Sequence, residues 1–273
     1  MPNIDLIGGA SVETTASTAA IDRLLACDWP AGTRVYITYL PTSSPQEIVA
    51  AAVRVRRAGL VPVPHISARM TATAEQLDDY LASATGEAAV DQVMLIGGDA
   101  ERPLGPYASA LEVLQTGLLQ RRGIAKVSLA AYPEGHPQIS QEALDEALQA
   151  KLALLRAEGL QSLVVTQMCF EAEPILAWID LFGRAAQTAP VQVGLAGIAS
   201  VASLVRYAVM CGVGPSIRAL SRQPSLGRLL TDTGPDKIVR ALAEAAPPQV
   251  AGLHLFLFGA PAKTADWLRS VRA

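Results

Sequence analysis

Polar side chains follow several apolar runs of the sequence, at the points where strands are expected to end. Glu13 follows an apolar run near the N-terminus, Asp99 follows residues 94–96 and two glycines, and Gln167 follows residues 163–165. A carboxylic acid can donate a proton to a leaving nitrogen, and an amide can pair with the donors and acceptors of a heterocycle. Because the carboxyl ends of parallel strands meet at one face of an α/β barrel, we expect a polar site there.

Two longer segments combine such side chains in a specific order. Residues 130–137 read Ala-Ala-Tyr-Pro-Glu-Gly-His-Pro, and residues 166–170 read Thr-Gln-Met-Cys-Phe. The first resembles the A-Y-P-E-x-H-P signature of the methylenetetrahydrofolate reductases, and the second resembles that family's T-Q-F-F-F segment. Collinear matches at low identity extend the resemblance over most of the chain, at residues 11–13, 37–39, 64–65, 98–99, 107–109 and 253–256.

This resemblance implies an enzyme that interconverts 5,10-methylene- and 5-methyltetrahydrofolate, with NADH or NADPH as co-substrate and FAD as cofactor. It implies that the chain corresponds to the family's catalytic barrel alone. In the family, a glutamate at the position of Glu13 is the proposed proton donor to the folate. Reduction requires the imidazolidine ring to open to an iminium, and a carboxylic acid with a raised pKa is a suitable donor to the leaving nitrogen.

Asp99 ends the segment Met-Leu-Ile-Gly-Gly-Asp, in which two glycines allow a ligand to approach the backbone closely. The family has an aspartate at this position beside the flavin and the pterin. The negative charge of Asp99 would disfavour ionisation of a nearby Glu13 and would favour the cationic iminium. The alternative roles are a solvated loop acid for Glu13 and a turn or helix cap for Asp99.

The resemblance also implies which residues contact the cofactor and the substrate. The path of the isoalloxazine, the ribityl chain and the phosphates would be lined by Thr38, Tyr39, His65, Ile96, Gly97, Gly98, Asp99, Ala108, Ala130, Tyr132, His136 and Asp145. Folate or nicotinamide would contact Gln167, Asp99 and Leu204. Met168 and Cys169 replace two family aromatics, and Leu204 stands where the family often has phenylalanine, so aromatic stacking would be weaker.

The cations that family members use at the FAD phosphates are replaced in this sequence. The family has an arginine just before the Gly-Asp pair and a lysine late in the fifth helix. The corresponding residues here are Gly97 and Leu154 or Leu155, with Lys151 and Arg156 as the nearest cations. Each charge-assisted hydrogen bond lost is worth about 1.5 to 3 kcal/mol, so we expect FAD to bind weakly. Two alternatives remain: direct hydride transfer from NAD(P)H to folate without flavin, and a folate-binding or methyl-transfer accessory protein that is not a reductase.

Strand-like runs alternate with amphipathic segments, which is typical of repeated βα units and a parallel sheet. The predicted strands are residues 4–12, 34–39, 61–65, 92–96, 126–131, 162–166, 192–197 and 252–258. The predicted helices are one after Thr18, then 45–58, 73–84, 106–121, 141–158, 174–186, 201–210, 235–245 and 263–271, with short helices within 212–234. Eight strands satisfy barrel closure, so the predicted fold is α/β, a (β/α)8 TIM barrel that occupies residues 1–273 as a single domain.

Composition limits the remaining function classes. The chain has 273 residues, of which 51% are hydrophobic and 17% charged, and its Lys and Arg residues are scattered, which argues against nucleic-acid binding. No apolar run approaches the ~20 residues needed to cross a bilayer and the N-terminus lacks signal-peptide features, so we expect a cytoplasmic protein. Cys27, Cys169 and Cys211 are widely spaced, and the three histidines lack partners at metal-ligand spacing, so we expect neither disulfides nor a metal. The choice between NADH and NADPH, and the formation of a homo-oligomer, stay open.

Overall fold

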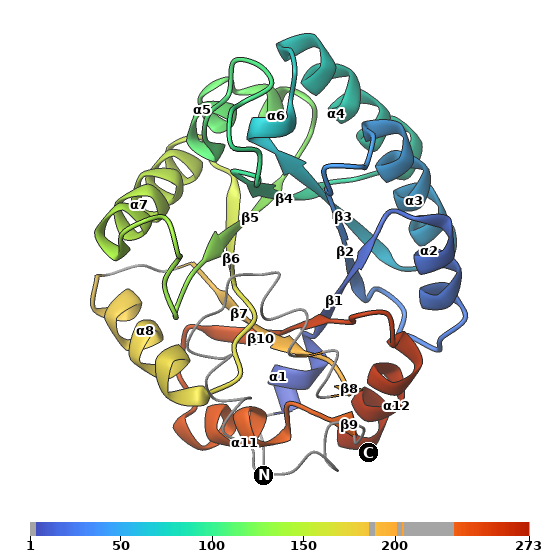
Figure 1. Cartoon of the computed structure of the whole chain (residues 1–273), viewed down its shortest axis with the longest axis vertical. Coiled ribbons are helices and arrows are strands. Elements are labelled where there is room, and N and C mark those ends of the chain that lie inside the picture. The colour runs from blue at the N-terminus through green and yellow to red at the C-terminus, as the bar shows by residue number, and fades with distance from the viewer. Residues whose placement is uncertain (1–3, 186–188, 201–203, 205–231, 273) are drawn as a thin grey trace. The chain divides into compact units, whose positions relative to one another are not determined.

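Eight strands pair in a closed parallel barrel (Figure 1), which confirms the predicted (β/α)8 fold. The computed structural model describes residues 4–185, 189–200, 204 and 232–272. In the order of their neighbours, the barrel strands are β1 (Ser11–Thr15), β10 (Val250–Phe256), β7 (Val191–Ala196), β6 (Gln161–Thr166), β5 (Lys126–Ala131), β4 (Gln92–Ile96), β3 (Val61–Ser67) and β2 (Arg34–Thr38). Two further short strands, β8 (Ala199–Ser200) and β9 (Asp232–Thr233), pair in the antiparallel direction.

Helices separate the barrel strands along the chain. They are α2 (Thr18–Leu25), α3 (Pro45–Arg57), α4 (Ala74–Ala88), α5 (Ala110–Gln115), α6 (Leu118–Arg121), α7 (Gln141–Ala157), α8 (Ala172–Arg184), α11 (Asp236–Ala245) and α12 (Pro261–Arg272). A short helix, α1 (Ile4–Gly8), precedes β1, and a 3-10 turn, η1 (Ala68–Met70), follows β3.

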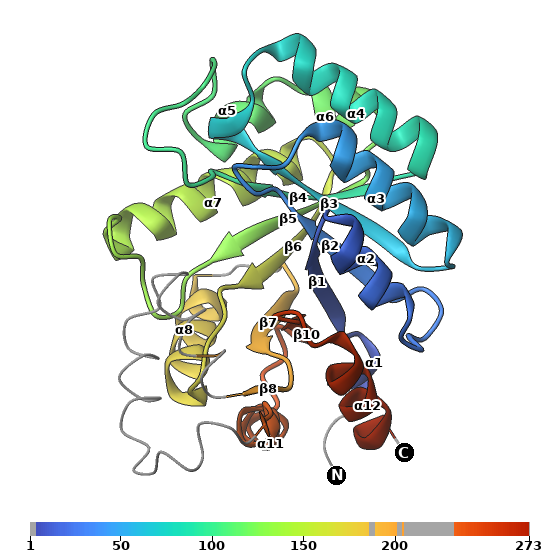
Figure 2. The same ribbon diagram turned by 45° about the vertical axis from the view of Figure 1, so that its right-hand side comes forward.

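The contacts of the chain divide it into two compact units, each made of separate sequence segments. The first unit contains Met1–Val12, Ala131–Leu144 and Val165–Ala273, and the second contains Glu13–Ala130 and Asp145–Val164. Within the second unit, α3 and α4 lie side by side and α3 also packs on β3 (Figure 2).

The start of α3 follows directly from its sequence. The Ser44 side chain accepts from the Glu47 backbone N–H at 3.2 Å, and the Ser44 N–H donates to the Glu47 carboxylate at 2.8 Å. Pro45 occupies the first turn, where its missing N–H costs no hydrogen bond. This reciprocal cap explains why the helix predicted over 45–58 begins at Pro45.

The predicted strand over residues 4–12 is wrong at its beginning. Ile4–Gly8 forms the helix α1, and β1 starts only at Ser11 and continues through Glu13 to Thr15. Leu6 and Ile7 are buried, and α1 packs on β10 and α12. A short apolar run does not distinguish a buried helix from a buried strand by its periodicity, which explains the error. Glu13 therefore lies within β1 rather than after its end.

The predicted helix over 106–121 is also wrong, because two short helices occupy this region. A second reciprocal cap, between Ser109 and Glu112, starts α5 at Ala110. Gly117 has a φ of 64°, and this left-handed conformation separates α5 from α6. The turn at Gly117 therefore interrupts the helix, although the residues around it favour helical structure.

The other predicted elements agree with the structure to different extents. The remaining seven predicted strands match described strands to within two residues at each end. The short strand β9 lies within 212–234, where short helices were expected. Residues 212–231 of that segment, Cys211, and the predicted helix 201–210 apart from Leu204 lie outside the described residues.

Each unit contains a buried polar network on its barrel strands. In the second unit, the Tyr36 hydroxyl lies 2.9 Å from the Ser128 hydroxyl, and the Gln92 amide donates to both. Burial raises the pKa of Tyr36 to about 12. In the first unit, the Ser11 hydroxyl contacts Gln192 Oε1 at 3.0 Å and His254 Nδ1 at 2.9 Å. His254 is therefore a buried histidine of the core.

Candidate functional site

Glu13 and His65 form the central ionisable pair of the second unit. Glu13 Oε2 lies 3.5 Å from His65 Nε2, and the two side chains are 18% and 6% exposed. Glu13 comes from β1 and His65 from β3, 52 residues later in the sequence. The carboxyl group is thus reachable from solvent while its described partner is buried.

His65 is fixed by contacts with two tyrosines. The Tyr80 hydroxyl, from α4, donates to the His65 carbonyl oxygen at 3.0 Å. The Tyr36 ring, from β2, meets the imidazole edge-on, with centroids 6.2 Å apart and an interplanar angle of 82°. Burial raises the pKa of Tyr80 well above its ordinary value, so both tyrosines remain neutral at physiological pH.

The turn after β4 is built around two glycines with different surroundings. Gly98 has a φ of 92°, and a Cβ added there would lie 2.0 Å from the Ser67 hydroxyl oxygen. A Cβ added at Gly97 would meet nothing within 4 Å, so open space lies beside this residue. The Ser67 hydroxyl is buried and has no hydrogen-bond partner among the described residues. Asp99 follows the turn as an exposed side chain, and its expected effect on the ionisation of Glu13 stays a prediction.

Arg69 holds the loop that follows this turn, a role that the sequence analysis missed. Its guanidinium donates to the carbonyl oxygens of Ala100 at 2.6 Å, Glu101 at 2.5 Å and Ala108 at 3.3 Å. Its backbone N–H donates to the Gly97 carbonyl at 2.9 Å. An arginine two residues beyond a strand carries no pattern that distinguishes a loop anchor from a solvated cation, so no sequence signal identified it.

The other predicted cofactor residues of the second unit occupy the ends of neighbouring strands and two nearby segments. Thr38 ends β2 and Tyr39 follows it, while Ile96 ends β4, and all three side chains are partly exposed. Because β2, β3 and β4 are parallel, their carboxyl ends lie at the same edge of the sheet. Three further predicted residues are the exposed Ala108 before α5, the partly buried Ala130 in β5 and the partly buried Asp145 in α7.

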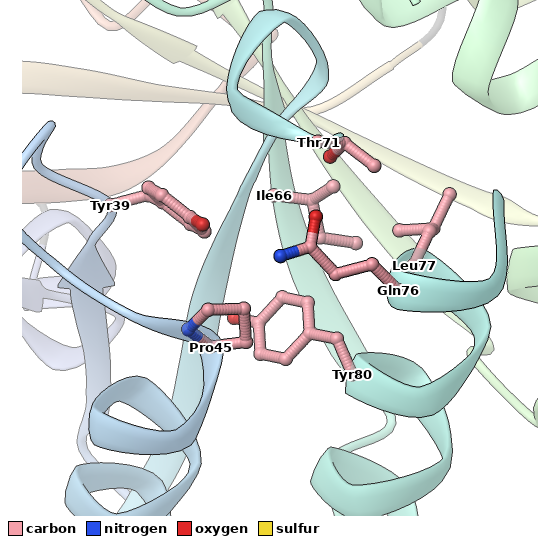
Figure 3. A pocket seen from close by; sticks show the side chains of 7 residues that line it. All are labelled: Tyr39, Pro45, Ile66, Thr71, Gln76, Leu77 and Tyr80. Atoms are coloured by element: carbon pink, nitrogen blue, oxygen red, sulfur yellow. The ribbon is translucent and has the colours of Figure 1, made fainter. Parts of the chain in front are cut away.

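A small pocket lies beside this edge, between the starts of α3 and α4 (Figure 3). The side chains that line it are Tyr39, Pro45, Ile66, Thr71, Gln76, Leu77 and Tyr80. Its volume of about 10 Å³ suits a single water molecule. Tyr39 is its only member among the predicted cofactor residues, and the pocket is too small for any part of a flavin.

The described residues suit the ring of FAD better than its phosphates. The open space at Gly97 and the exposed backbone of the turn leave room for a planar ring beside β4. Leu155 is buried in the core, Arg156 is exposed on α7, and burial lowers the pKa of Lys151. The three donors of Arg69 described above already bind carbonyl oxygens. None of these residues therefore offers the pyrophosphate a dedicated cation.

In the first unit, the Tyr-Pro-Glu-Gly-His motif forms a tight turn. The Gly135 N–H donates to the Tyr132 carbonyl at 2.9 Å, and Gly135 has a φ of 79°. This turn brings the Tyr132 and His136 rings into edge-to-face contact, with centroids 5.5 Å apart. Both predicted cofactor residues of the motif are thus held together by the local chain.

Gln167 is held by its backbone while part of its side chain has no partner. Its N–H donates to the Ala131 carbonyl at 2.7 Å. A Cβ at Gly194 would lie 2.2 Å from the Thr166 carbonyl oxygen, so only glycine permits this approach of β7. The Gln167 Oε1 atom is buried and accepts no hydrogen bond from the described residues. A buried amide oxygen of this kind is available to a ligand donor.

Met168 and Leu204 belong to an apolar cluster rather than to an open surface. Both are buried with Ala196 and Ala199, and Phe170, Phe256 and Phe258 pack against them. The rings of Phe256 and Phe258 are stacked, with centroids 6.1 Å apart and an interplanar angle of 14°. The sequence analysis assigned neither aromatic a role; Phe256 ends β10 and Phe258 follows it, and their two-residue spacing was the available signal. Burial also raises the pKa of Cys169 well above its ordinary value, so its thiol stays protonated.

The described residues contain neither a cluster of metal ligands nor a membrane-spanning helix. No group of three or more His, Cys, Asp or Glu side chains there has the arrangement of a metal site. Within the same part of the chain, no helix combines the length and the apolar character that a membrane span requires.

Comparison with known proteins identifies the fold and the family. The structure is similar to dihydropteroate synthase from Thermus thermophilus, with 13% identity and a TM-score of 0.52 over 98% of this chain and 96% of that chain. It is also similar to 7,8-dihydropteroate synthase from Vibrio fischeri, with 13% identity and a TM-score of 0.47 over 97% and 94% of the two chains. At 13% identity, the likeness to dihydropteroate synthase from Thermus thermophilus shows a similar fold and nothing about function. The family model of methylenetetrahydrofolate reductase matches residues 13–223, and the chain therefore belongs to the methylenetetrahydrofolate reductase family.

Proposed function

We propose that this protein interconverts 5,10-methylene- and 5-methyltetrahydrofolate, with NADH or NADPH as the hydride partner. Membership of a family of folate-related reductases supports an oxidoreductase that acts on folate. The observation that carries the finer proposal is the position of Glu13, a partly exposed carboxyl group within a barrel strand. An acid at this position suits the protonation that opens the imidazolidine ring.

Glu13 acts as the general acid in this proposal. It donates a proton to the folate nitrogen that leaves the methylene carbon, and the ring then opens to the iminium that accepts hydride. A general acid typically contributes a factor of 10² to 10⁴ to the rate. The exposed Asp99 carboxylate favours the cationic iminium through its charge, while its solvation limits that effect.

Gln167 binds the folate through its side-chain amide. Its buried Oε1 has no described partner, and a pterin edge presents N–H groups that such an oxygen can accept. The tight contact at Gly194 keeps the segment that carries Gln167 in place. Met168 and Leu204 support this segment from the apolar cluster and do not stack on the pterin.

The cofactor in this proposal is a weakly held FAD. When bound, FAD supplies an acceptor that holds the hydride between the nicotinamide and the folate. Thr38, Tyr39, His65 and Gly98 would hold its ring and ribityl chain, and the family resemblance adds Tyr132 and His136 as contacts. The pyrophosphate would rely on backbone N–H groups, because the nearby guanidinium donors are committed to carbonyl oxygens.

Direct hydride transfer from NAD(P)H to folate without flavin is the second candidate. The observation that favours it is the lack of a cation at the two positions where the family binds the phosphates, with glycine at residue 97 and a buried leucine at residue 155. Titration of FAD into dialysed protein, with folate reduction as the readout, distinguishes the two. A saturable rise in rate supports weakly bound FAD, whereas full activity without flavin and no response to FAD supports direct transfer.

The proposed role of Glu13 is tested by Glu13→Gln. We expect this variant to keep its fold and to lose folate turnover by about 100-fold or more, because the amide cannot donate the required proton. Glu101→Gln, which changes an exposed acid in the loop after β4, is the matched control and should retain wild-type turnover. Wild-type folate turnover in Glu13→Gln would remove this residue from the mechanism.

A further inference from the structure

The proposed acid of this protein, Glu13, lies beside a base. The described partner of Glu13 is the His65 imidazole, whose Nε2 lies 3.5 Å from Glu13 Oε2. Asp99, the carboxylate expected to keep a proton on Glu13, is exposed after the turn that follows β4. An unperturbed glutamic acid titrates near pH 4.3, so it would carry no proton to donate at neutral pH.

Two tyrosines that contact His65 do not supply this proton. Tyr36 on β2 and Tyr80 on α4 contact the histidine, and burial raises the pKa of each. Arg34, also on β2, interacts electrostatically with Tyr36 and stays positively charged. The proton that Glu13 needs at neutral pH can therefore come from the imidazole beside it.

We propose that His65 is a positioning residue that keeps a proton in reserve for Glu13, so that the pair shares one proton at neutral pH. This inference rests on the proposed role of Glu13 as general acid. Two ionisable groups this close titrate as a pair, and between the two titration steps one proton is distributed over both. The singly protonated pair exists partly as carboxylic acid with neutral imidazole and partly as carboxylate with imidazolium.

The proton balance of one turnover follows from this pairing. The Glu13 carboxyl group gives its proton to the leaving folate nitrogen and becomes a carboxylate. The Nε2–H of the His65 imidazolium then passes its proton to Glu13 Oε2, which leaves a neutral imidazole. Because both ring nitrogens of His65 are buried, the pair regains its proton from solvent through the partly exposed Glu13 carboxyl group. The 3.5 Å separation must shorten to about 3 Å for this transfer.

Nuclear magnetic resonance tests the pair without any activity measurement. The chain has three histidines, so imidazole ¹⁵N signals recorded from pH 5 to 9 can be assigned with one variant each of His136 and His254. We expect the titration midpoint of His65 to fall by about one pH unit or more in Glu13→Gln, which is a tenfold loss of proton affinity. The midpoint of His136, in the turn after β5, is the internal control. An unchanged His65 midpoint, or no titration of His65 in the wild-type protein, would overturn the shared proton.

The pH dependence of folate reduction tests the role in turnover. In His65→Gln, only Glu13 can hold the proton, so the alkaline limb of the kcat profile should move to lower pH by about one unit or more. We expect kcat at pH 7.5 to fall about tenfold or more and to recover towards the wild-type value near pH 5.5, with little change in the KM for folate. A purely structural role would lower kcat by the same factor at every pH, and that result would contradict the proposal.

The two experiments separate failure of the inference from failure of the proposed function. If His65→Gln does not fold, the measurement on Glu13→Gln still decides whether the proton is shared. If the wild-type protein does not reduce methylenetetrahydrofolate, the proposed function fails, and an unchanged His65 midpoint would independently reject the pair.

Discussion

Gly98→Ala should destabilise the protein, whereas the same change at Gly97 should not. An alanine at residue 98 must adopt a φ of 92°, and backbone in sparsely populated regions costs about 1–3 kcal/mol. Its Cβ would also lie 2.0 Å from the Ser67 hydroxyl oxygen. Ser67 is fully buried, so rotation of its side chain away from the new methyl group adds about 0.5–1.5 kcal/mol. We therefore expect a total loss of roughly 1.5–4.5 kcal/mol in the free energy of unfolding.

Urea unfolding followed by tryptophan fluorescence measures this loss. Gly97→Ala is the matched control, because its Cβ meets nothing within 4 Å, and it should stay within about 0.5 kcal/mol of wild type. Ser67→Ala removes the clashing oxygen, so Gly98→Ala should cost about 0.5–1.5 kcal/mol less in that background. Equal stability of Gly97→Ala and Gly98→Ala, or no relief from Ser67→Ala, would refute this account of the turn.

Two further changes have expected outcomes. Gln167→Ala should weaken folate binding by about 1–3 kcal/mol and nicotinamide binding by less, because it removes the buried amide that pairs with the pterin. Steady-state kinetics with each substrate varied checks this, with Gln161→Ala at the start of β6 as the control. Equal small losses for both substrates would contradict it. Burial raises the pKa of Tyr36 to about 12, above the value near 10 that a tyrosine has in the unfolded chain. The contribution of Tyr36 to stability is therefore full below about pH 10 and is lost as the pH rises towards 12. Over this window the free energy of unfolding should fall by about 2.7 kcal/mol from Tyr36 alone. Urea unfolding at pH 9 to 11.5 should therefore show a smaller fall in the free energy of unfolding for Tyr36→Phe than for wild type. An identical fall in both proteins would contradict this.

Local signals predicted most of the fold because each acts within a few residues. The cap that starts α3 joins Ser44 and Glu47, which are three positions apart in the sequence. The alternation of strands and helices requires only apolar and amphipathic runs of suitable length. The prediction failed where packing or a single turn decides between two structures. Residues 4–8 form a helix because they pack on β10 and α12, and Gly117 ends a helix that its neighbours favour.

The candidate site was predictable in its residues but not in its contacts. Glu13, His65 and Gln167 each follow or end an apolar run, and the family resemblance suggested their roles. The contact between Glu13 and His65 joins β1 to β3, and no local pattern specifies such a pairing. The anchoring of the loop by Arg69 depends on carbonyl oxygens more than thirty residues away along the chain, which the sequence does not reveal.

The central claim is that this protein reduces methylenetetrahydrofolate with a nicotinamide. The most direct test incubates the purified protein anaerobically with 5,10-methylenetetrahydrofolate and NADH or NADPH, with and without added FAD, and measures 5-methyltetrahydrofolate by chromatography. The account predicts one 5-methyltetrahydrofolate formed for each NAD(P)H consumed, at a rate that added FAD increases. Absence of 5-methyltetrahydrofolate with both nicotinamides, with and without FAD, would contradict the reductase assignment and favour a folate-binding accessory protein.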